Sequence, residues 1–115
     1  MIAEAEAIKT AHKDAFNQDY EIEGFDFTGK AVKCHWRKDE KQATADLVFT
    51  SGAGGGIIIQ QISTSLAILK FSKTTAQMAD VAVGTYQYDI EAVDGAGNAF
   101  TLCYGTVKVL KKYTF

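Results

Sequence analysis

The side chains that could take part in catalysis are few and lie apart in the sequence. The chain has two histidines, His12 and His35, and two cysteines, Cys34 and Cys103. Cys34 and His35 are neighbours in a stretch of alternating polarity, and successive side chains of a strand point to opposite faces. The alternation turns the Cys34 thiol away from the His35 imidazole, which rules out a nucleophile–base pair between them. We therefore interpret both histidines as exposed side chains.

Asp89 and Glu91 come closest to a pair of catalytic carboxylates. They share the polar face of one predicted strand, with Cα atoms about 7 Å apart. A glycosidase needs its pair in a cleft, with the pKa of one carboxyl raised, whereas a solvated strand face accounts for both residues. Residues 94–98 lack the ligand pattern of a calcium loop, and the glycine-rich residues 52–56 lack the Lys-Ser/Thr pair of a phosphate loop. We identify no catalytic, cofactor-binding or metal-binding residue.

The cysteines and most tyrosines fall at apolar positions of alternating stretches. Cys34 and Cys103 are interpreted as buried thiols that pack as small hydrophobic groups. A disulfide between two sheets is the alternative, which a reducing compartment disfavours, and the spacing is not that of a metal site. At least three of the five tyrosines occupy core positions, and a sugar-stacking platform is the alternative for this residue type.

Composition is typical of one globular domain. The chain has 115 residues, of which 47% are hydrophobic and 23% charged, and its net charge is −2. This charge gives no electrostatic basis for binding nucleic acid or an anionic membrane. No window approaches the about 20 apolar residues of a spanning helix, and the start of the chain lacks the features of a signal peptide. We therefore expect folding in the cytoplasm.

A β-hairpin is the strongest structural signal in the sequence. Apolar and polar residues alternate over 84–93, and the return stretch begins at Phe100, with Phe100, Leu102 and Tyr104 on one face. Glycine, asparagine and aspartate fill the connecting residues 94–98, as they do in tight turns. The alternation slips after Tyr104, which predicts a β-bulge at Gly105.

Further strands and one N-terminal segment complete the predicted fold. The strands are expected at 16–22, 32–37, 45–50, 57–59 and 65–71, and residues 72–78 are expected to form a turn or one helical turn. The isoleucines of 57–59 predict a strand that is buried or covered on both faces. About seven short strands without a long helical period predict an all-β fold, an antiparallel β-sandwich over residues 14–115. Residues 1–13 are alanine-rich and are expected to form an N-terminal arm or a short helix.

The stretch from Asp80 to Tyr88 resembles the tyrosine corner of immunoglobulin-like domains, which implies an immunoglobulin-like β-sandwich. In that motif a tyrosine near the start of the penultimate strand donates a hydrogen bond back to the upstream backbone. Tyr88 stands where antibody domains place their second cysteine. The disulfide between the sheets of those domains is therefore missing, and Trp36 could fill the centre.

Three stretches resemble motifs of a known family. D-F-T-G-K-A-V at 26–32 is similar to D-L-T-G-x-x-V, and G-T-Y-Q-Y-D-I at 84–90 is similar to G-x-Y-x-Y-D-L. Residues 94–109 resemble D-x-x-G-x-x-x-T-L-L-x-G-x-V-x-V, with Cys103 in place of the second leucine. Phe27 replaces the usual aliphatic residue of the first motif. In this order the motifs resemble the small β-sandwich domains of bacteriophage virion proteins, including the N-terminal domain of baseplate upper proteins.

The resemblance spans roughly residues 14–110 and implies a phage or prophage virion structural protein. Such a tail, baseplate or head–tail component is not an enzyme, has no cofactor or metal, and acts through contacts with other virion proteins. Its location is the virion, after folding in the host cytoplasm, and homo-oligomerisation is left open. A carbohydrate- or receptor-binding β-sandwich module is the alternative function. As contact surfaces we expect residues 1–13, ordered by a neighbour, and the 51–56 loop with the 94–98 turn.

Overall fold

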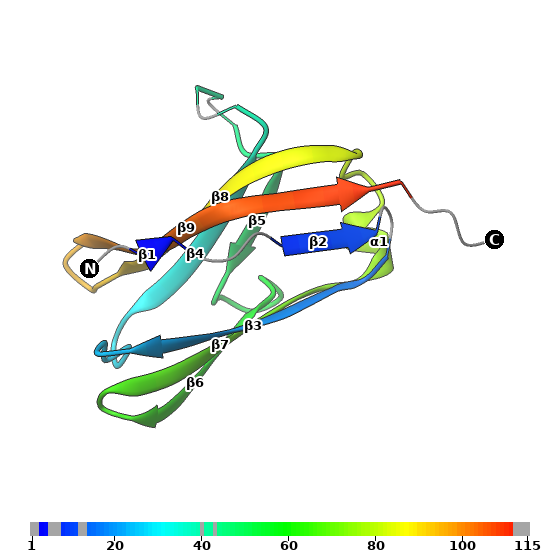
Figure 1. Ribbon diagram of the computed structural model, residues 1–115. Helices are drawn as coiled ribbons and strands as arrows, with labels where there is room; N and C mark the ends of the chain where they lie inside the picture. Colours follow the sequence, from blue (N-terminus) through cyan, green and yellow to red (C-terminus); the bar gives the residue numbers. More distant parts are fainter. Residues whose placement is uncertain (1–2, 5–7, 12–13, 40, 43, 112–115) are drawn as a thin grey trace.

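The computed structural model describes residues 3–4, 8–11, 14–39, 41–42 and 44–111. These residues form nine strands and one short helix (Figure 1). In chain order they are β1 (Ala3–Glu4), β2 (Ile8–Ala11), β3 (Phe16–Glu23), β4 (Ala31–Arg37), β5 (Leu47–Thr50), β6 (Ile57–Ser63), β7 (Leu66–Lys73), α1 (Thr75–Met78), β8 (Gly84–Val93) and β9 (Ala99–Leu110). In the described part of the chain, no helix has the length and hydrophobicity needed to span a membrane.

Two sheets pack face to face around the core. The larger sheet has the order β1-β9-β8-β4-β5, with β2 also paired to β9, and the smaller sheet has the order β3-β7-β6. Strands β3 to β9 pair only in antiparallel fashion with one another. They are the seven strands that the sequence predicts, and the antiparallel immunoglobulin-like sandwich is confirmed.

Period-two alternation explains why these stretches are strands. Every second residue of β4 is buried from Val32 to Trp36, and every second residue of β8 is buried from Tyr86 to Ala92. Full burial of a large apolar side chain stabilises the fold by about 1.5–3 kcal/mol. The alternation thus sets which face of each strand turns toward the opposite sheet.

Aromatic side chains join the two sheets. Trp36, on β4 of the larger sheet, meets Phe16, on β3 of the smaller one, with ring centroids 5.1 Å apart in an edge-to-face arrangement. Phe49 of β5 and Phe71 of β7 make a second such contact at 5.3 Å. Edge-to-face pairs add about 0.5–1.5 kcal/mol beyond the burial of their area. Trp36 therefore fills the centre of the sandwich.

The tyrosine corner is present as predicted. The Tyr86 hydroxyl donates a hydrogen bond of 2.6 Å to the carbonyl oxygen of Ala82. Just upstream, α1 is the predicted single helical turn, and Thr74 caps it through a reciprocal pair of hydrogen bonds with Gln77. The helix and the corner together fix the crossing from β7 in one sheet to β8 in the other.

The N-terminal segment is extended where it is described, so the helix alternative is wrong for those residues. β1 and β2 run parallel to β9, with Ala3 opposite Cys103 and Ile8 opposite Val107. The helix propensity of alanine is a weak preference, and the free side of β9 offers backbone partners that outweigh it. The expectation that a neighbouring protein orders this segment is also wrong for the described strands, because their own chain pairs with them.

The β-bulge lies at Leu102 and not at Gly105. The pairing of β8 with β9 shifts between Ile90 and Glu91, which leaves Leu102 without a partner. As a result both Leu102 and Cys103 are buried, and the inward positions change from even to odd numbers. Gly105 is one of the inward positions. A Cβ atom there would lie 2.9 Å from the hydroxyl oxygen of Tyr88, so glycine makes room for that ring.

Strand β6 is covered on one face only, which corrects the expectation for the three isoleucines. Ile57 is 4% exposed, whereas Ile58 is 64% exposed. The reason is its place at the rim of the smaller sheet, whose outward face has no covering layer among the described residues. A run of apolar residues therefore does not here indicate a strand buried on both sides.

Candidate functional site

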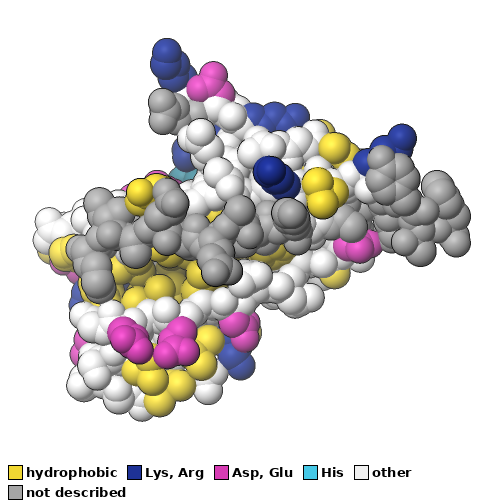
Figure 2. Space-filling view, viewed as in Figure 1, with side chains coloured by type: hydrophobic (Ala, Val, Ile, Leu, Met, Phe, Trp, Pro, Cys, Tyr) yellow, Lys and Arg dark blue, Asp and Glu magenta, His cyan; other side chains and the backbone are white. Residues whose placement is uncertain are grey.

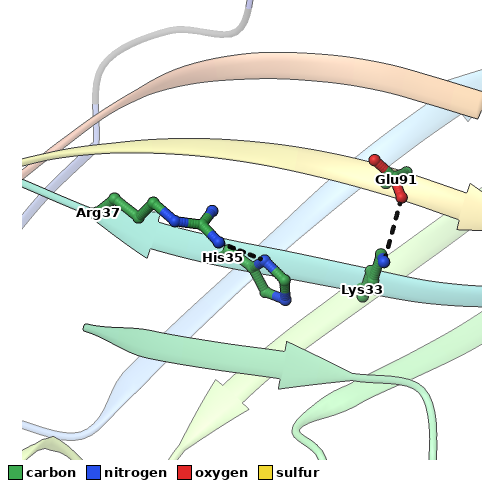
Figure 3. A network of polar contacts seen from close by, with 4 residues as sticks. All are labelled: Lys33, His35, Arg37 and Glu91. Atoms are coloured by element: carbon green, nitrogen blue, oxygen red, sulfur yellow. Dashed lines mark hydrogen bonds and ion pairs between the residues drawn. The ribbon is translucent and has the colours of Figure 1, made fainter. Parts of the chain in front are cut away.

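The outward face of β4 and β8 carries the charged cluster that contains His35 (Figure 3). Lys33, His35 and Arg37 project away from the core because the residues between them are buried. On the adjacent strand β8, Asp89 lies opposite His35 and Glu91 lies opposite Lys33. The pairing of β4 with β8 thus brings together the histidine and both carboxylates that the sequence singled out.

The charges in this cluster pair locally and do not converge on a common point. Lys33 Nζ lies 3.3 Å from Glu91 Oε1, and the two side chains are 45% and 23% exposed. Arg37 Nη2 lies 3.3 Å from His35 Nδ1. Figure 3 shows the two pairs at separate places along the strands. An ion pair as exposed as Lys33–Glu91 contributes only about 0–1 kcal/mol, so the cluster is a surface with mixed charge.

The surroundings of His35 favour its neutral form. Burial lowers the pKa of His35, and the positive charges of Arg37 and Lys33 lower it further, against the weaker opposing effect of Asp89 and Glu91. The Nδ1 atom of a neutral ring accepts a hydrogen bond, and the Arg37 guanidinium donates it. His35 points outward as predicted, although its neighbours cover it in part. His12 lies outside the described residues.

Both thiols are buried, free and unreactive. Burial raises the pKa of Cys34 well above its usual range and raises that of Cys103 to about 11. The two cysteines lie in the same sheet, on either side of Ile90. Two strand spacings separate their Cα atoms by about 9–10 Å, beyond the about 7 Å that a disulfide can bridge. The interpretation as buried thiols is confirmed, and a disulfide between the sheets is wrong.

The 94–98 turn uses its carboxylate to close the hairpin. Asp94 Oδ1 accepts hydrogen bonds from the backbone N–H groups of Ala96 and Asn98, both at 2.9 Å. Asp94 Oδ2 accepts a further bond from the Asn98 amide. These bonds lower the pKa of Asp94. The carboxylate is thus committed to the turn, in agreement with the prediction of a hairpin turn at this place.

The 51–56 loop contacts other elements than the turn does. It lies between β5 and β6, and Lys73 Nζ at the end of β7 donates to the carbonyl oxygen of Gly55. Its next element is a strand, as expected for a loop that is not a phosphate site. None of the contacts found for the described residues links it to the 94–98 turn, so the predicted joint contact surface stays a prediction.

Three of the described tyrosines lie in the core or pack against it, as predicted. The described side chains of types that bind metals form no cluster. Tyr86 and Tyr88 are buried, Tyr20 packs against the core, and Tyr104 is 44% exposed. Tyr113 lies outside the described residues. Within the described part of the chain, no three His, Cys, Asp or Glu side chains lie close enough together to hold a metal ion.

A pair of tyrosines spans the two sheets near the position of the antibody disulfide, and sequence reasoning did not identify it. The rings of Tyr20 and Tyr88 are 6.2 Å apart between centroids. Burial is the largest cause of the raised pKa of each. The contact between the two hydroxyls raises the pKa of Tyr20 further and lowers that of Tyr88, against the effect of burial. The Tyr88 hydroxyl is buried and has no hydrogen-bond partner of proper geometry among the described residues. The sequence signal that could have identified this pair is that Tyr88 stands where antibody domains place their second cysteine.

Comparisons with known proteins add little to this description. No known protein family matches the sequence, and no curated protein matches it either. Among solved structures, a chain in the crystal structure of the ZIG-8-RIG-5 IG1-IG1 heterodimer aligns over 90% of this chain and 81% of its own length, with 15% identity and a TM-score of 0.39. At these values the comparison carries no statement about function. The fold assignment rests on the strand order and the tyrosine corner.

Proposed function

We propose that this chain is a non-enzymatic structural protein of a phage or prophage virion, in the tail, the baseplate or the head–tail junction. It acts through contacts with other virion proteins, and its location is the assembled particle. The observation that carries the proposal is the order of the three motifs in the sequence. In the fold, residues 26–32 lead into β4, residues 84–90 lie in β8, and residues 94–109 form the turn and most of β9. These are adjacent strands of the larger sheet.

The distinctive residues of the motifs have structural tasks, as a scaffold protein requires. Asp26 Oδ1 accepts bonds from the backbone N–H and the hydroxyl of Thr28, which shapes the turn before β4. Asp94 closes the hairpin in the same manner. Gly105 leaves space for the Tyr88 ring. Each motif therefore specifies a turn or a close packing contact, and this supports a structural role for the residues that carry the resemblance.

The chemistry of the surface supports a role without catalysis. Glu91 and His35 are engaged with Lys33 and Arg37, and burial raises the pKa of both thiols. A nucleophilic cysteine needs a lowered pKa and access to solvent. Among the described candidates, Glu91 and His35 are thus engaged with neighbouring side chains and both thiols are enclosed.

A carbohydrate- or receptor-binding module remains the second candidate, with less support. Stacking a sugar would require aromatic rings that are exposed together on one face. Phe100 is 40% exposed and Tyr104 is 44% exposed. The bulge at Leu102 lies between them, so Phe100 keeps the parity of the buried Leu102 while Tyr104 alternates with the buried Cys103. The two rings therefore project from opposite faces of β9.

Fractionation of virus particles tests the proposal. Particles released from cells that carry the gene are purified by density gradient, and mass spectrometry searches them for peptides of this chain. We expect the chain in the particle band at a fixed ratio to the major structural proteins, and deletion of the gene should leave incomplete or non-infectious particles. A chain that stays in the particle-free fraction, together with normal particles after deletion, would contradict the proposal. Binding of the isolated chain on a glycan array would instead support the second candidate.

A further inference from the structure

The two sheets have four edges, and three of them are protected against pairing with another chain. An exposed strand edge carries unpaired backbone N–H and C=O groups, and proteins blunt such edges by shortness or by charge. β5 has four residues, β1 has two and β2 has four. β3 is long, but Asp19, Glu21 and Glu23 are exposed along it. Each of these edges therefore resists the addition of a strand.

The edge formed by β6 is protected neither by shortness nor by charge, and its bulge lies only at its C-terminal end, between Gln61 and Ser63. β6 has seven residues, Ile57–Ser63, with neither a charge nor a proline, and β7 is its partner in the described structure. Ile58 is 64% exposed and Ile62 is 53% exposed. Figure 2 shows hydrophobic side chains gathered at the surface over this end of the smaller sheet, beside acidic ones. Sequence and exposure thus mark β6 as a strand that is open to pairing.

The backbone of β6 offers a defined set of free groups. The Ser72 N–H donates to the Gly56 carbonyl oxygen at 2.7 Å, in register with the ladder that pairs Ile57 with Phe71. In an antiparallel ladder, hydrogen-bonded and non-hydrogen-bonded pairs alternate. The N–H and C=O groups of Ile59 and Gln61 consequently point to the open side, while those of residues 58 and 60 point to β7. At the start of β6 the edge is not open, because Gly56 forms a parallel bridge with Thr50 of β5.

We propose that a second copy of this chain docks on this edge, with antiparallel pairing of the two β6 strands about a two-fold axis at Gln60. This register places Ile58 opposite Ile62 of the second copy and Gln60 opposite its own counterpart. It also brings the free groups of Ile59 and Gln61 together as a hydrogen-bonded pair. The outward side chains of β6 are therefore complementary to themselves.

The distribution of charge favours a second copy over a charged partner. β6 itself carries no charge that would repel its symmetry mate. The two acidic β3 strands would stand at the outer ends of a continuous six-stranded sheet. Five strand spacings separate them by about 24 Å, which exceeds the Debye length of about 8 Å at physiological ionic strength. Because β3 stays blunted, pairing ends at the dimer and does not continue into a filament.

The expected affinity is low, since the seam is short. A stable dimer buries about 800 Å² on each partner, and a seam of seven residues with two isoleucines per copy falls below this area. We expect a dissociation constant of roughly 10–1000 µM. Fixing several copies in one assembly would strengthen the contact through effective concentration. The inference stands on β6 alone and does not depend on the proposed virion role.

Charged substitutions at the two-fold axis test the inference. In sedimentation experiments up to about 2 mM, the wild-type chain should show a reversible monomer–dimer equilibrium. Gln60→Lys and Gln60→Glu should each remain monomeric, because like charges meet at the axis, and an equimolar mixture should recover dimers. Gln87→Lys is the matched control, an exposed glutamine on β8 of the other sheet, and should dimerise like the wild type.

Hydrogen exchange provides a second readout within the same samples. The N–H groups of Ile59 and Gln61 should become protected as the concentration rises, whereas those of residues 58 and 60 are already protected by β7. Three results would overturn the inference: a wild-type chain that is monomeric throughout, a Gln60→Lys variant that dimerises normally, or a Gln87→Lys variant that loses the dimer. If the wild-type chain stays monomeric and β6 pairs only with a strand of another protein, this also counts as the first of these results.

Discussion

Two tyrosines on β8 should respond in different ways to the loss of the same atom. Tyr86 and Tyr88 are both buried, at 1% and 4% exposure, and face the same side of the strand. The Tyr86 hydroxyl donates a bond of 2.6 Å to the Ala82 carbonyl. The Tyr88 hydroxyl is enclosed without a partner of proper geometry among the described residues. Replacement by phenylalanine removes one hydroxyl in each case, so each variant serves as the matched control of the other.

The expected magnitudes follow from the hydrogen-bond balance. Tyr86→Phe should lower the free energy of unfolding by about 1–2 kcal/mol, because a net hydrogen bond is lost. Tyr88→Phe removes a buried polar group whose contact with the Tyr20 hydroxyl falls short of a regular hydrogen bond. An unpaired buried polar group costs a protein about 1–3 kcal/mol. The small void left behind offsets part of this gain. We expect the free energy of unfolding to stay the same or to rise by up to about 1 kcal/mol.

Urea unfolding followed by the fluorescence of Trp36 measures both effects, since Trp36 is buried and is the only tryptophan. With an m-value of about 2 kcal/mol/M, the midpoint of Tyr86→Phe should fall by about 0.5–1 M relative to the wild type. The midpoint of Tyr88→Phe should stay or rise. If Tyr88→Phe lost as much stability as Tyr86→Phe, the Tyr88 hydroxyl would have a stabilising partner, and the reasoning would be refuted.

Three further predictions concern the thiols, the histidine and the glycine on β9. Cys34 and Cys103 should react with a thiol reagent at pH 8 only as fast as the chain unfolds, and fast labelling of the folded chain would contradict their burial. His35 should titrate by NMR with a midpoint below 6.5; its lowered pKa means that its contribution to stability is complete above about pH 6.5 and is lost as the pH falls through the folded pKa, a trend that His35→Gln should abolish. Gly105→Ala should cost about 1–3 kcal/mol through overpacking, and less in a Tyr88→Phe background because the nearest atom is gone; equal costs in both backgrounds would contradict the close approach of Tyr88 to Gly105.

Local pattern was sufficient to predict most of the sandwich. The hairpin of β8 and β9, the alternation around Trp36 and the single helical turn all depend on neighbours within a few residues. The tyrosine corner links residues only four apart in sequence. Such features depend on residues that are close in sequence, so a single sequence is enough to predict them.

Features that depend on distant pairing could not be predicted in the same way. β1 pairs with β9, whose residues lie about a hundred positions later, with Ala3 opposite Cys103. The exposure of Ile58 depends on the outward face of its sheet, where Lys70 of the central strand β7 is exposed as well, and the residues of β6 alone do not reveal this. The sequence predicts the bulge at Gly105 because glycine is frequent at bulges. The bulge lies instead at Leu102, between Thr101 and Cys103, and only the register of β9 with β8 identifies this position.

The candidate site also combines features that local alternation predicts with features that depend on the folded arrangement. Alternation predicted the outward direction of His35 and the separation of its ring from the Cys34 thiol. It could not predict that Glu91 would pair with Lys33 or that Arg37 would donate to His35, because those contacts require the folded arrangement of β4 and β8. The Tyr20–Tyr88 pair depends on contact between the sheets and was equally out of reach.

The parallel arrangement of β2 and β9 has a mechanical consequence. Their four paired positions run from Ile8 opposite Val107 to Ala11 opposite Leu110, so the two strands lie side by side and point the same way (Figure 1). A pulling force applied between these strands would load their evenly spaced hydrogen bonds in shear, all at one time, and would not open them one after another. Resistance to such a force is set by the rate of unfolding. Pulling these two strands apart along their axes would therefore require the hydrogen bonds between them to break together.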